Sequence, residues 1–183
     1  FSNYSEKLRF IKLPDGTKMT YRDSTVFDFP KGTVLIKNFY YPVDFRNPRK
    51  GKVILETRLL VHEEAGWQAY PYIWDEKQTE AWYDPAGETR PIRYVGKSGK
   101  KIATSYLIPN KNQCKGCHLS EDSLVPIGPS ARQLNVDQGS GKNQLLAWKE
   151  QGILEGLPPL EAVPPGVVWD NTGTGDLNDR ARA

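Results

Sequence analysis

Lys52-Val-Ile-Leu-Glu-Thr-Arg-Leu-Leu-Val-His62 is the stretch that decides the fold, because it is the longest strand pattern in the chain. Alternate residues of a strand point to opposite faces. One face of this strand would therefore carry Leu55, Thr57, Leu59 and Val61, and the other would carry Glu56, Arg58, Leu60 and His62. The turn residues Glu63–Gly66 and the aromatic run Trp67–Trp74 follow directly, which predicts a β-hairpin.

Further strand patterns lie on both sides of this hairpin. Gly32–Tyr41 is rich in β-branched and aromatic residues and is stopped by Pro42. Arg90–Val95 and Ile102–Ile108 flank a glycine-bounded turn, which predicts a second hairpin. Several short strands at such spacing are typical of an antiparallel sandwich or barrel.

The chain changes character after Pro109, where loop and helix patterns replace strands. The best helix pattern runs from Asn143 to Gly152, with Asn143 as the N-cap and Gly152 as the stop. The expected fold class is therefore α+β. We expect a β-rich antiparallel sandwich or barrel-like part in residues 1–108 and a small loop and helical part in 109–183, either as two parts or as one integrated domain.

Composition excludes several classes of protein. The chain has 183 residues, of which 38% are hydrophobic, and its five Trp, nine Tyr and six Phe supply material for a core, so disorder is excluded. The net charge of +3 is too small and scattered to indicate nucleic-acid binding. No apolar run approaches the length of a transmembrane segment.

Both cysteines and one of the two histidines fall within the five residues Cys114-Lys-Gly-Cys117-His118. Cys-x-x-Cys-His is the signature of covalent c-type haem attachment. Two thiols at this spacing add to the two vinyl groups of haem, and the adjacent imidazole then ligates the iron. We therefore predict one covalent haem c held by Cys114, Cys117 and the proximal ligand His118.

Three other interpretations of the motif fit less well. A disulfide between Cys114 and Cys117 would leave His118 unexplained. A thioredoxin-like redox pair expects a βαβ setting, which the strand and helix patterns do not provide. A zinc site needs four ligands, and the second histidine, His62, is far away in sequence.

The residues after the motif resemble those of class I cytochromes c, which carry a Gly-Pro segment at about this offset. Here the segment is Gly128-Pro129. The resemblance implies that the Pro129 carbonyl accepts the N–H of His118, which would fix the ring tautomer. Arg132 follows, and it is a candidate partner for a haem propionate or else a solvated arginine.

At a larger scale the chain resembles the central part of a family of poorly characterised diheme c-type cytochromes. The resemblance rests on the segments Phe29–Pro42, Glu56–Leu60, Trp74–Thr79, Ile108–His118, Pro126–Pro129, Asn143–Leu145 and Asp179–Ala183. Members of this family are longer at both ends and continue into a second Cys-x-x-Cys-His segment. The resemblance therefore implies electron transfer, and it implies that this chain is a one-haem piece of a longer one.

The sixth iron ligand is left open by the sequence. Class I cytochromes use a methionine after the haem motif, whereas the single methionine here is Met19, which precedes it. His62 is the first intrinsic candidate and Met19 the second. A segment of a partner, a Lys or Tyr, or an open site are the alternatives.

The expected function is electron transfer by an exported bacterial protein of the periplasm or cell surface, with other haem proteins, redox partners or a second haem segment of the parent chain as partners. An electron carrier is favoured over an enzyme. The first alternative is a haem enzyme subunit, peroxidase-like or dehydrogenase-linked, with an open distal site. The second is a partner-binding or carbohydrate-binding β-domain with an accessory haem, to which aromatic residues such as Trp67 and Trp82 would contribute.

Overall fold

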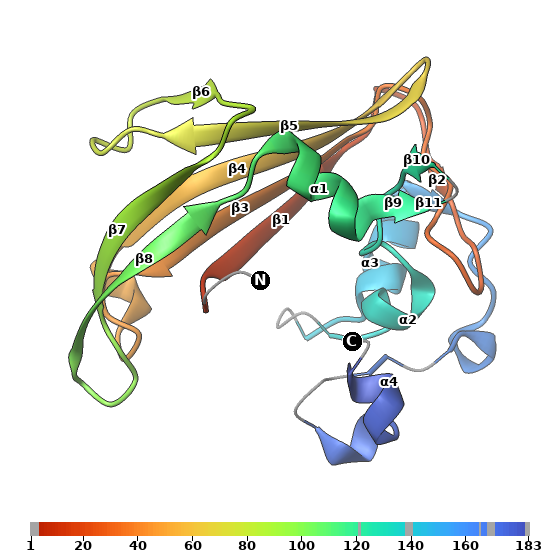
Figure 1. Cartoon of the computed structure of the whole chain (residues 1–183). Coiled ribbons are helices and arrows are strands. Elements are labelled where there is room, and N and C mark those ends of the chain that lie inside the picture. The colour runs from red at the N-terminus through yellow and green to blue at the C-terminus, as the bar shows by residue number, and fades with distance from the viewer. Residues whose placement is uncertain (1–3, 121, 138–140, 165, 168–170, 182–183) are drawn as a thin grey trace. The chain divides into compact units, whose positions relative to one another are not determined.

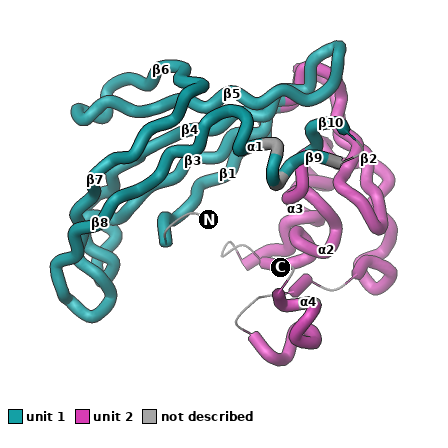
Figure 2. The backbone as a smooth tube through the Cα atoms, viewed as in Figure 1, with its two compact units in different colours: residues 1–12, 34–125 teal, residues 13–33, 126–183 magenta. Residues whose placement is uncertain are grey.

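The structure is a computed structural model. It describes residues 4–120, 122–137, 141–164, 166–167 and 171–181, and for Lys115, Cys117, Ser120 and Asp179 it describes the backbone alone. The chain divides into two compact units (Figure 2). Unit 1 comprises residues 1–12 and 34–125, and unit 2 comprises residues 13–33 and 126–183.

Unit 1 consists mainly of strands, with a single longer helix, α1, near its end (Figure 1). Its elements are β1 (Glu6–Lys12), β3 (Val34–Pro42), a 3₁₀ turn (Pro48–Lys50), β4 (Lys52–Glu63), β5 (Gly66–Trp74), β6 (Ala81–Tyr83), β7 (Glu88–Val95), β8 (Lys101–Ile108), α1 (Lys111–His118), β9 (Leu119–Ser120) and β10 (Ser123–Leu124).

Five strands of unit 1 form one antiparallel sheet in the order β1-β3-β4-β5-β6. The predicted hairpin at its centre is confirmed: β4 and β5 pair up to Glu63 and Gly66. The second predicted hairpin is confirmed as β7 and β8, which pair up to Val95 and Lys101. Gly66 and Gly99 have φ of 104° and 83°, backbone conformations that favour glycine at these turns.

The pairing of β3 with β4 contains a bulge next to Phe39. Phe39 lies opposite Glu56 and Tyr40 lies opposite Ile54, so Leu55 is the additional residue on β4. Leu55 and Glu56 are consequently both buried. The predicted strict alternation, which placed these two residues on opposite faces, is therefore wrong at this point.

The core of unit 1 lies between the five-stranded sheet and the β7–β8 hairpin. Its buried members are Phe39, Tyr41, Leu55, Ile73, Ile92, Tyr106 and Ile108. Glu56 has no exposed area, and its carboxylate accepts hydrogen bonds from Tyr106 Oη at 2.6 Å and from Arg58 Nε and Nη2 at 2.7 and 2.6 Å. Two charge-assisted hydrogen bonds from Arg58 and one short hydrogen bond from Tyr106 therefore satisfy this buried carboxylate.

Unit 2 is built from short elements: β2 (Met19–Thr20), α2 (Ala131–Leu134), α3 (Gln144–Glu150), β11 (Leu154–Glu155), two 3₁₀ turns (Leu160–Ala162 and Thr172–Thr174) and α4 (Leu177–Ala181). β2 pairs with β11 in parallel, so the early segment of unit 2 is tied to its late segment. The buried side chains come from both segments and include Met19, Phe27, Ala131, Leu145 and Leu154.

The predicted helix start at Asn143 is confirmed. The Asn143 side chain accepts hydrogen bonds from the N–H groups of Leu145 and Leu146, which caps α3. Gly152 follows the helix with φ of 72°, as expected for a residue that ends it.

The β-rich α+β class is confirmed, since antiparallel sheets dominate and helices are few and short. The boundary between the units differs from the predicted one after residue 108. The helix α1 contacts β5, and β10 also contacts β5, so residues 109–125 belong to the β-rich unit. Residues 13–33, which lie within the predicted β-rich part, belong instead to unit 2.

Candidate functional site

The Cys-x-x-Cys-His motif lies on α1 of unit 1. Positions 114, 117 and 118 are three and four residues apart, so they share one face of the helix. Cys114 is buried, and its Sγ lies 3.8 Å from the Asn110 carbonyl oxygen one turn earlier. The predicted role of Cys117 concerns a side chain outside the described part of the structure.

The start of α1 is fixed by two reciprocal hydrogen bonds. The Asn110 side chain accepts from the Gln113 N–H at 2.9 Å, and the Gln113 side chain accepts from the Asn110 N–H at 2.8 Å. This arrangement is a capping box, which satisfies two donors that a helix start otherwise leaves unpaired. Asn-x-x-Gln directly before the motif is the sequence signal for this capping box, which the predicted elements did not include.

We expect Asn110→Ala to lower the stability of unit 1 by about 1 kcal/mol, because it removes the N-cap of α1. The measurement is the midpoint of thermal unfolding. Asn112→Ala is the matched control, since Asn112 is an exposed residue inside the same helix and alanine is the better helix former there. Equal midpoints for the two variants would contradict the capping role.

His118, the last residue of α1, is held by Val125. The imidazole Nδ1 lies 2.9 Å from the Val125 carbonyl oxygen, and the Val125 N–H donates to the His118 carbonyl at 2.7 Å. A carbonyl only accepts, so the ring hydrogen is on Nδ1 and Nε2 keeps its lone pair. This tautomer is the one in which a histidine ligates a metal through Nε2.

The pKa of His118 is lowered from its ordinary value, first by burial. The positive charges of Lys37 and Arg58 lower it further, while the hydrogen bond to Val125 acts in the opposite direction. The neutral imidazole, which is the form that coordinates iron, is therefore favoured at neutral pH.

The carbonyl that contacts His118 differs from the predicted one. Pro129 was the expected acceptor, whereas the structure has Val125 in this role, and the Pro129 carbonyl accepts from the Phe27 N–H at 3.0 Å within unit 2. The predicted pairing of Pro129 with His118 is therefore not made. Arg132 is half-buried on α2 of unit 2, and its predicted contact with a propionate remains a prediction.

The two candidates for the sixth ligand lie in different units. His62 is at the end of β4, and its ring stacks on Trp67 at a centroid distance of 4.6 Å and an interplanar angle of 6°. Met19 has no exposed area and belongs to the core of unit 2. Full burial favours the interpretation of Met19 as a core residue, and ligation by His62 remains a prediction.

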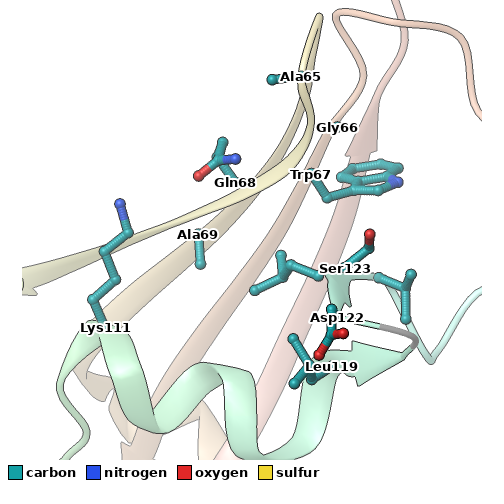
Figure 3. Close-up of a pocket in the computed structure, with 11 residues that line it drawn as sticks. Ala65, Gly66, Trp67, Gln68, Ala69, Lys111, Leu119, Asp122 and Ser123 are labelled. Atoms are coloured by element: carbon teal, nitrogen blue, oxygen red, sulfur yellow. The ribbon is translucent and has the colours of Figure 1, made fainter.

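A pocket of about 360 Å³ lies between β5 and the β9–β10 hairpin (Figure 3). Trp67 lies on one side and Leu119 and Ser123 lie on the other, while Lys111 of α1 is at one end. Val125 also lines the pocket, so this hollow adjoins the hairpin that holds His118. Of the described motif residues, neither Cys114 nor His118 lines it.

The aromatic residues of β5 and β6 pack across the strands. Tyr83 lies 6.0 Å from the rings of both Tyr70 and Tyr72, and Trp74 Nε1 donates to Thr57 Oγ1 at 2.9 Å. Trp82 and Tyr83 keep 48% and 42% of their area exposed at the sheet edge. Cross-strand packing therefore accounts for most of this aromatic set.

Two properties of the described residues bear on the predicted cofactor and partners. No group of three or more His, Cys, Asp or Glu side chains among them is placed to hold a metal ion. A covalent haem needs no such group, because thioethers and one imidazole hold it. Within the same part of the chain, no helix is both long and apolar enough to cross a membrane.

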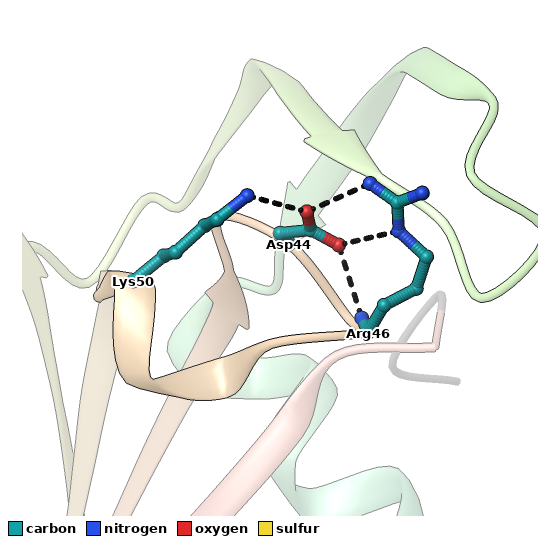
Figure 4. Close-up of polar contacts among 3 residues, drawn as sticks. All are labelled: Asp44, Arg46 and Lys50. Atoms are coloured by element: carbon teal, nitrogen blue, oxygen red, sulfur yellow. Dashed lines mark hydrogen bonds and ion pairs between the residues drawn. The ribbon is translucent and has the colours of Figure 1, made fainter.

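Asp44, in the loop between β3 and β4, is a buried carboxylate with a structural role (Figure 4). It accepts from the N–H and Nε of Arg46 at 3.0 Å, from Arg46 Nη2 at 3.0 Å and from Lys50 Nζ at 3.1 Å. These contacts to Arg46 and Lys50 hold the pKa of Asp44 well below its ordinary value. Asp44 therefore stabilises the loop, and both of its carboxylate oxygens are already engaged by Arg46 and Lys50.

We expect Asp44→Asn to lower the thermal midpoint at neutral pH, because the variant loses the charge on these hydrogen bonds. A carboxylate whose pKa is lowered by folding stabilises the fold at pH values above its pKa in the unfolded chain. This contribution is lost as the pH falls towards and through its pKa in the folded protein. The difference in thermal midpoint between wild type and variant should therefore be constant above about pH 5 and shrink below about pH 4. Unfolding midpoints across this range measure it, and a difference independent of pH would contradict the assignment.

Comparisons of the chain with protein-family models, with curated proteins and with solved structures give no match.

Proposed function

We propose that this chain is an electron-transfer protein that carries one covalent c-type haem. Cys114 and Cys117 would form the thioethers, and His118 would be the proximal iron ligand. The five-residue motif is the basis of the proposal, since its spacing and residue types match the chemistry of haem attachment.

The hydrogen bond between His118 Nδ1 and the Val125 carbonyl is the structural observation that supports this motif-based proposal. It orients the ring, places the hydrogen on Nδ1 and leaves Nε2 available as a donor. A histidine that ligates a metal commonly donates its second nitrogen in this way, and the bond raises the basicity of the ligating nitrogen. The residues present therefore fit a haem iron.

Haem supplies one-electron chemistry when it is bound. The chain has three tasks in this arrangement. The capped helix α1 holds the two thiol positions and the imidazole on one face. Val125 fixes the His118 tautomer, and the buried position of Cys114 shields one attachment point from solvent. Electron transfer also requires a partner, and other haem proteins or a second haem segment of a longer parent chain are the partners we expect.

The experiment is a spectrum of the reduced protein after expression with a c-type haem maturation system in a bacterial periplasm, the compartment we expect for it. A c-type α-band in the pyridine haemochrome, with haem retained under denaturing conditions, is the expected result. Absence of that band would end the proposal. Low-temperature electron paramagnetic resonance of the ferric protein then tests the sixth ligand: a low-spin signal that His62→Ala converts to high spin supports His62, and a high-spin wild type points to the haem enzyme alternative.

A further inference from the structure

Two segments of unit 1 that are far apart in sequence lie against each other (Figure 1). Residues 43–53 connect β3 to the start of β4, and residues 93–103 contain the tip of the β7–β8 hairpin. The Val95 N–H donates to the Val43 carbonyl at 3.0 Å, and the Phe45 N–H donates to the Val95 carbonyl at 2.9 Å. We call these two segments together the basic end of unit 1.

The basic end gathers cations that the sequence keeps in two separate stretches. It contains eight Lys or Arg residues and a single carboxylate, Asp44. The first segment supplies Arg46, Arg49, Lys50 and Lys52, and all of them are exposed. The second segment supplies Arg93, Lys97, Lys100 and Lys101, which are also exposed. The whole chain has a net charge of only +3, so the remaining residues together are net negative.

The described residues neutralise little of this charge. Asp44 is shared by Arg46 and Lys50 (Figure 4). The ion pairs found in the described part of the chain involve none of the other exposed cations Arg49, Arg93, Lys97, Lys100 and Lys101. Arg46 also lies so close to Gly99 that a Cβ there would be 2.8 Å from its Nη1. Cations concentrated in this way attract an extended anionic surface.

Apolar groups are exposed among these cations. Val43 and Val53 keep 44% and 41% of their area exposed. A hollow of about 290 Å³ is lined mainly by apolar side chains, including Val43 and Ile102, and Arg93 and Lys101 line it as well. A bilayer of anionic lipids offers both matching components, since its headgroups attract Lys and Arg and its acyl boundary accepts aliphatic groups.

The composition of the basic end favours a lipid surface over an acidic protein. Protein interfaces are enriched in aromatic residues and arginine and depleted in lysine. Five of the eight cations here are lysines, and none of the exposed residues of the basic end is aromatic. Flexible ammonium groups suit the diffuse charge of fluid headgroups, whereas they make poor anchors in a protein interface.

We infer that the basic end binds the surface of a bilayer that contains anionic phospholipids. The inference does not depend on the proposed function, because it uses none of the residues of the haem motif. Strand β8 runs for eight residues from Lys101 towards α1, a length of about 26 Å. The basic end and the haem motif are therefore two separate sites of unit 1.

The test is sedimentation of the full chain with vesicles of equimolar phosphatidylcholine and phosphatidylglycerol, and with vesicles of phosphatidylcholine alone. We expect the wild type to bind the first kind and not the second. The variant Lys97→Gln/Lys100→Gln/Lys101→Gln changes exposed residues at a turn and is expected to fold. A lysine at an anionic bilayer strengthens binding roughly fivefold, so this variant should bind on the order of a hundredfold more weakly.

The matched control is Lys12→Gln/Lys18→Gln/Lys77→Gln, which removes the same charge from exposed lysines outside the basic end. It should bind the anionic vesicles nearly as tightly as the wild type does. An equal loss in variant and control would overturn the inference, because net charge and not the basic end would then determine binding. A wild type that binds neither kind of vesicle would overturn it as well.

A competition experiment separates a lipid surface from an acidic protein. Poly-glutamate, added at the same concentration of negative charge as the phosphatidylglycerol, should leave most of the chain on the vesicles. It carries the same charge as the lipid but offers no acyl boundary for Val43 and Val53. Complete release of the chain by poly-glutamate would overturn the inference in favour of an acidic protein partner.

Discussion

A C114S/C117S variant is expected to carry no covalently bound haem, while the wild type retains its haem under denaturing conditions. The thioether bond needs a thiol, and serine offers a hydroxyl that does not add to the haem vinyl groups under the conditions of haem attachment. Either single variant keeps one thioether and should retain a smaller amount of haem. Haem staining of denatured protein, with the pyridine haemochrome spectrum as the quantitative measure, gives the result.

His62→Ala is the control for this experiment, because it removes the other candidate nitrogen ligand without touching the attachment chemistry. It should keep the full amount of covalent haem and change only the spin state of the iron. Covalent haem in the double variant at the wild-type level would refute the attachment through Cys114 and Cys117. A loss of covalent haem in both C114S/C117S and His62→Ala would show instead that unit 1 does not tolerate substitution.

Glu56→Ala is expected to destabilise the protein by about 3 kcal/mol, the largest stability effect we predict. The substitution leaves the Arg58 charge without its buried partner and the Tyr106 hydroxyl without its acceptor. Burial raises the pKa of Tyr106, so this hydroxyl stays protonated and cannot ionise to compensate. Urea unfolding with linear extrapolation measures the change.

Two further variants separate charge from packing at this position. Glu56→Gln keeps the shape of the side chain and most of its hydrogen bonds. This variant should therefore lose less unfolding free energy than Glu56→Ala. Glu76→Gln removes a carboxylate from an exposed loop residue and should change stability by less than about 0.5 kcal/mol. A result for Glu56→Ala as small as that of Glu76→Gln would show that the buried ion pair does not contribute to stability.

The strands of unit 1 could be predicted from sequence because their signals are local. Lys52–His62 is a long run of residues that favour strands, Gly66 and Gly99 mark turns, and the two hairpins join neighbours in the chain. The bulge beside Phe39 could not be predicted, since it arises from the pairing of two strands and changes which side of β4 is buried. The same limit applies to the boundary of unit 2, which depends on the pairing of β2 with β11.

The candidate site divides in the same way. Cys114, Cys117 and His118 are visible in the sequence as a motif, and the capping box of Asn110 and Gln113 was also visible there. The contact between His118 and Val125 depends on the short β9–β10 hairpin, which the sequence patterns did not predict. The resemblance to class I cytochromes indicated Pro129 instead. The alignment of Arg9, Lys37 and Arg58 on neighbouring strands depends on the register of three strands, which no spacing in the sequence encodes.

The parallel pairing of β2 with β11 also sets an order of events during synthesis. The hydrogen bond between Thr20 and Glu155 spans 135 residues, so the early segment of unit 2 leaves the ribosome long before its partner exists. Every strand of unit 1 after β1, and α1 with its motif, is translated within that interval. The helix α1 is therefore complete while Met19 and its neighbours still lack their β11 partners. A single cut in the chain cannot separate the two units, because residues 13–33 of unit 2 lie between the two segments of unit 1.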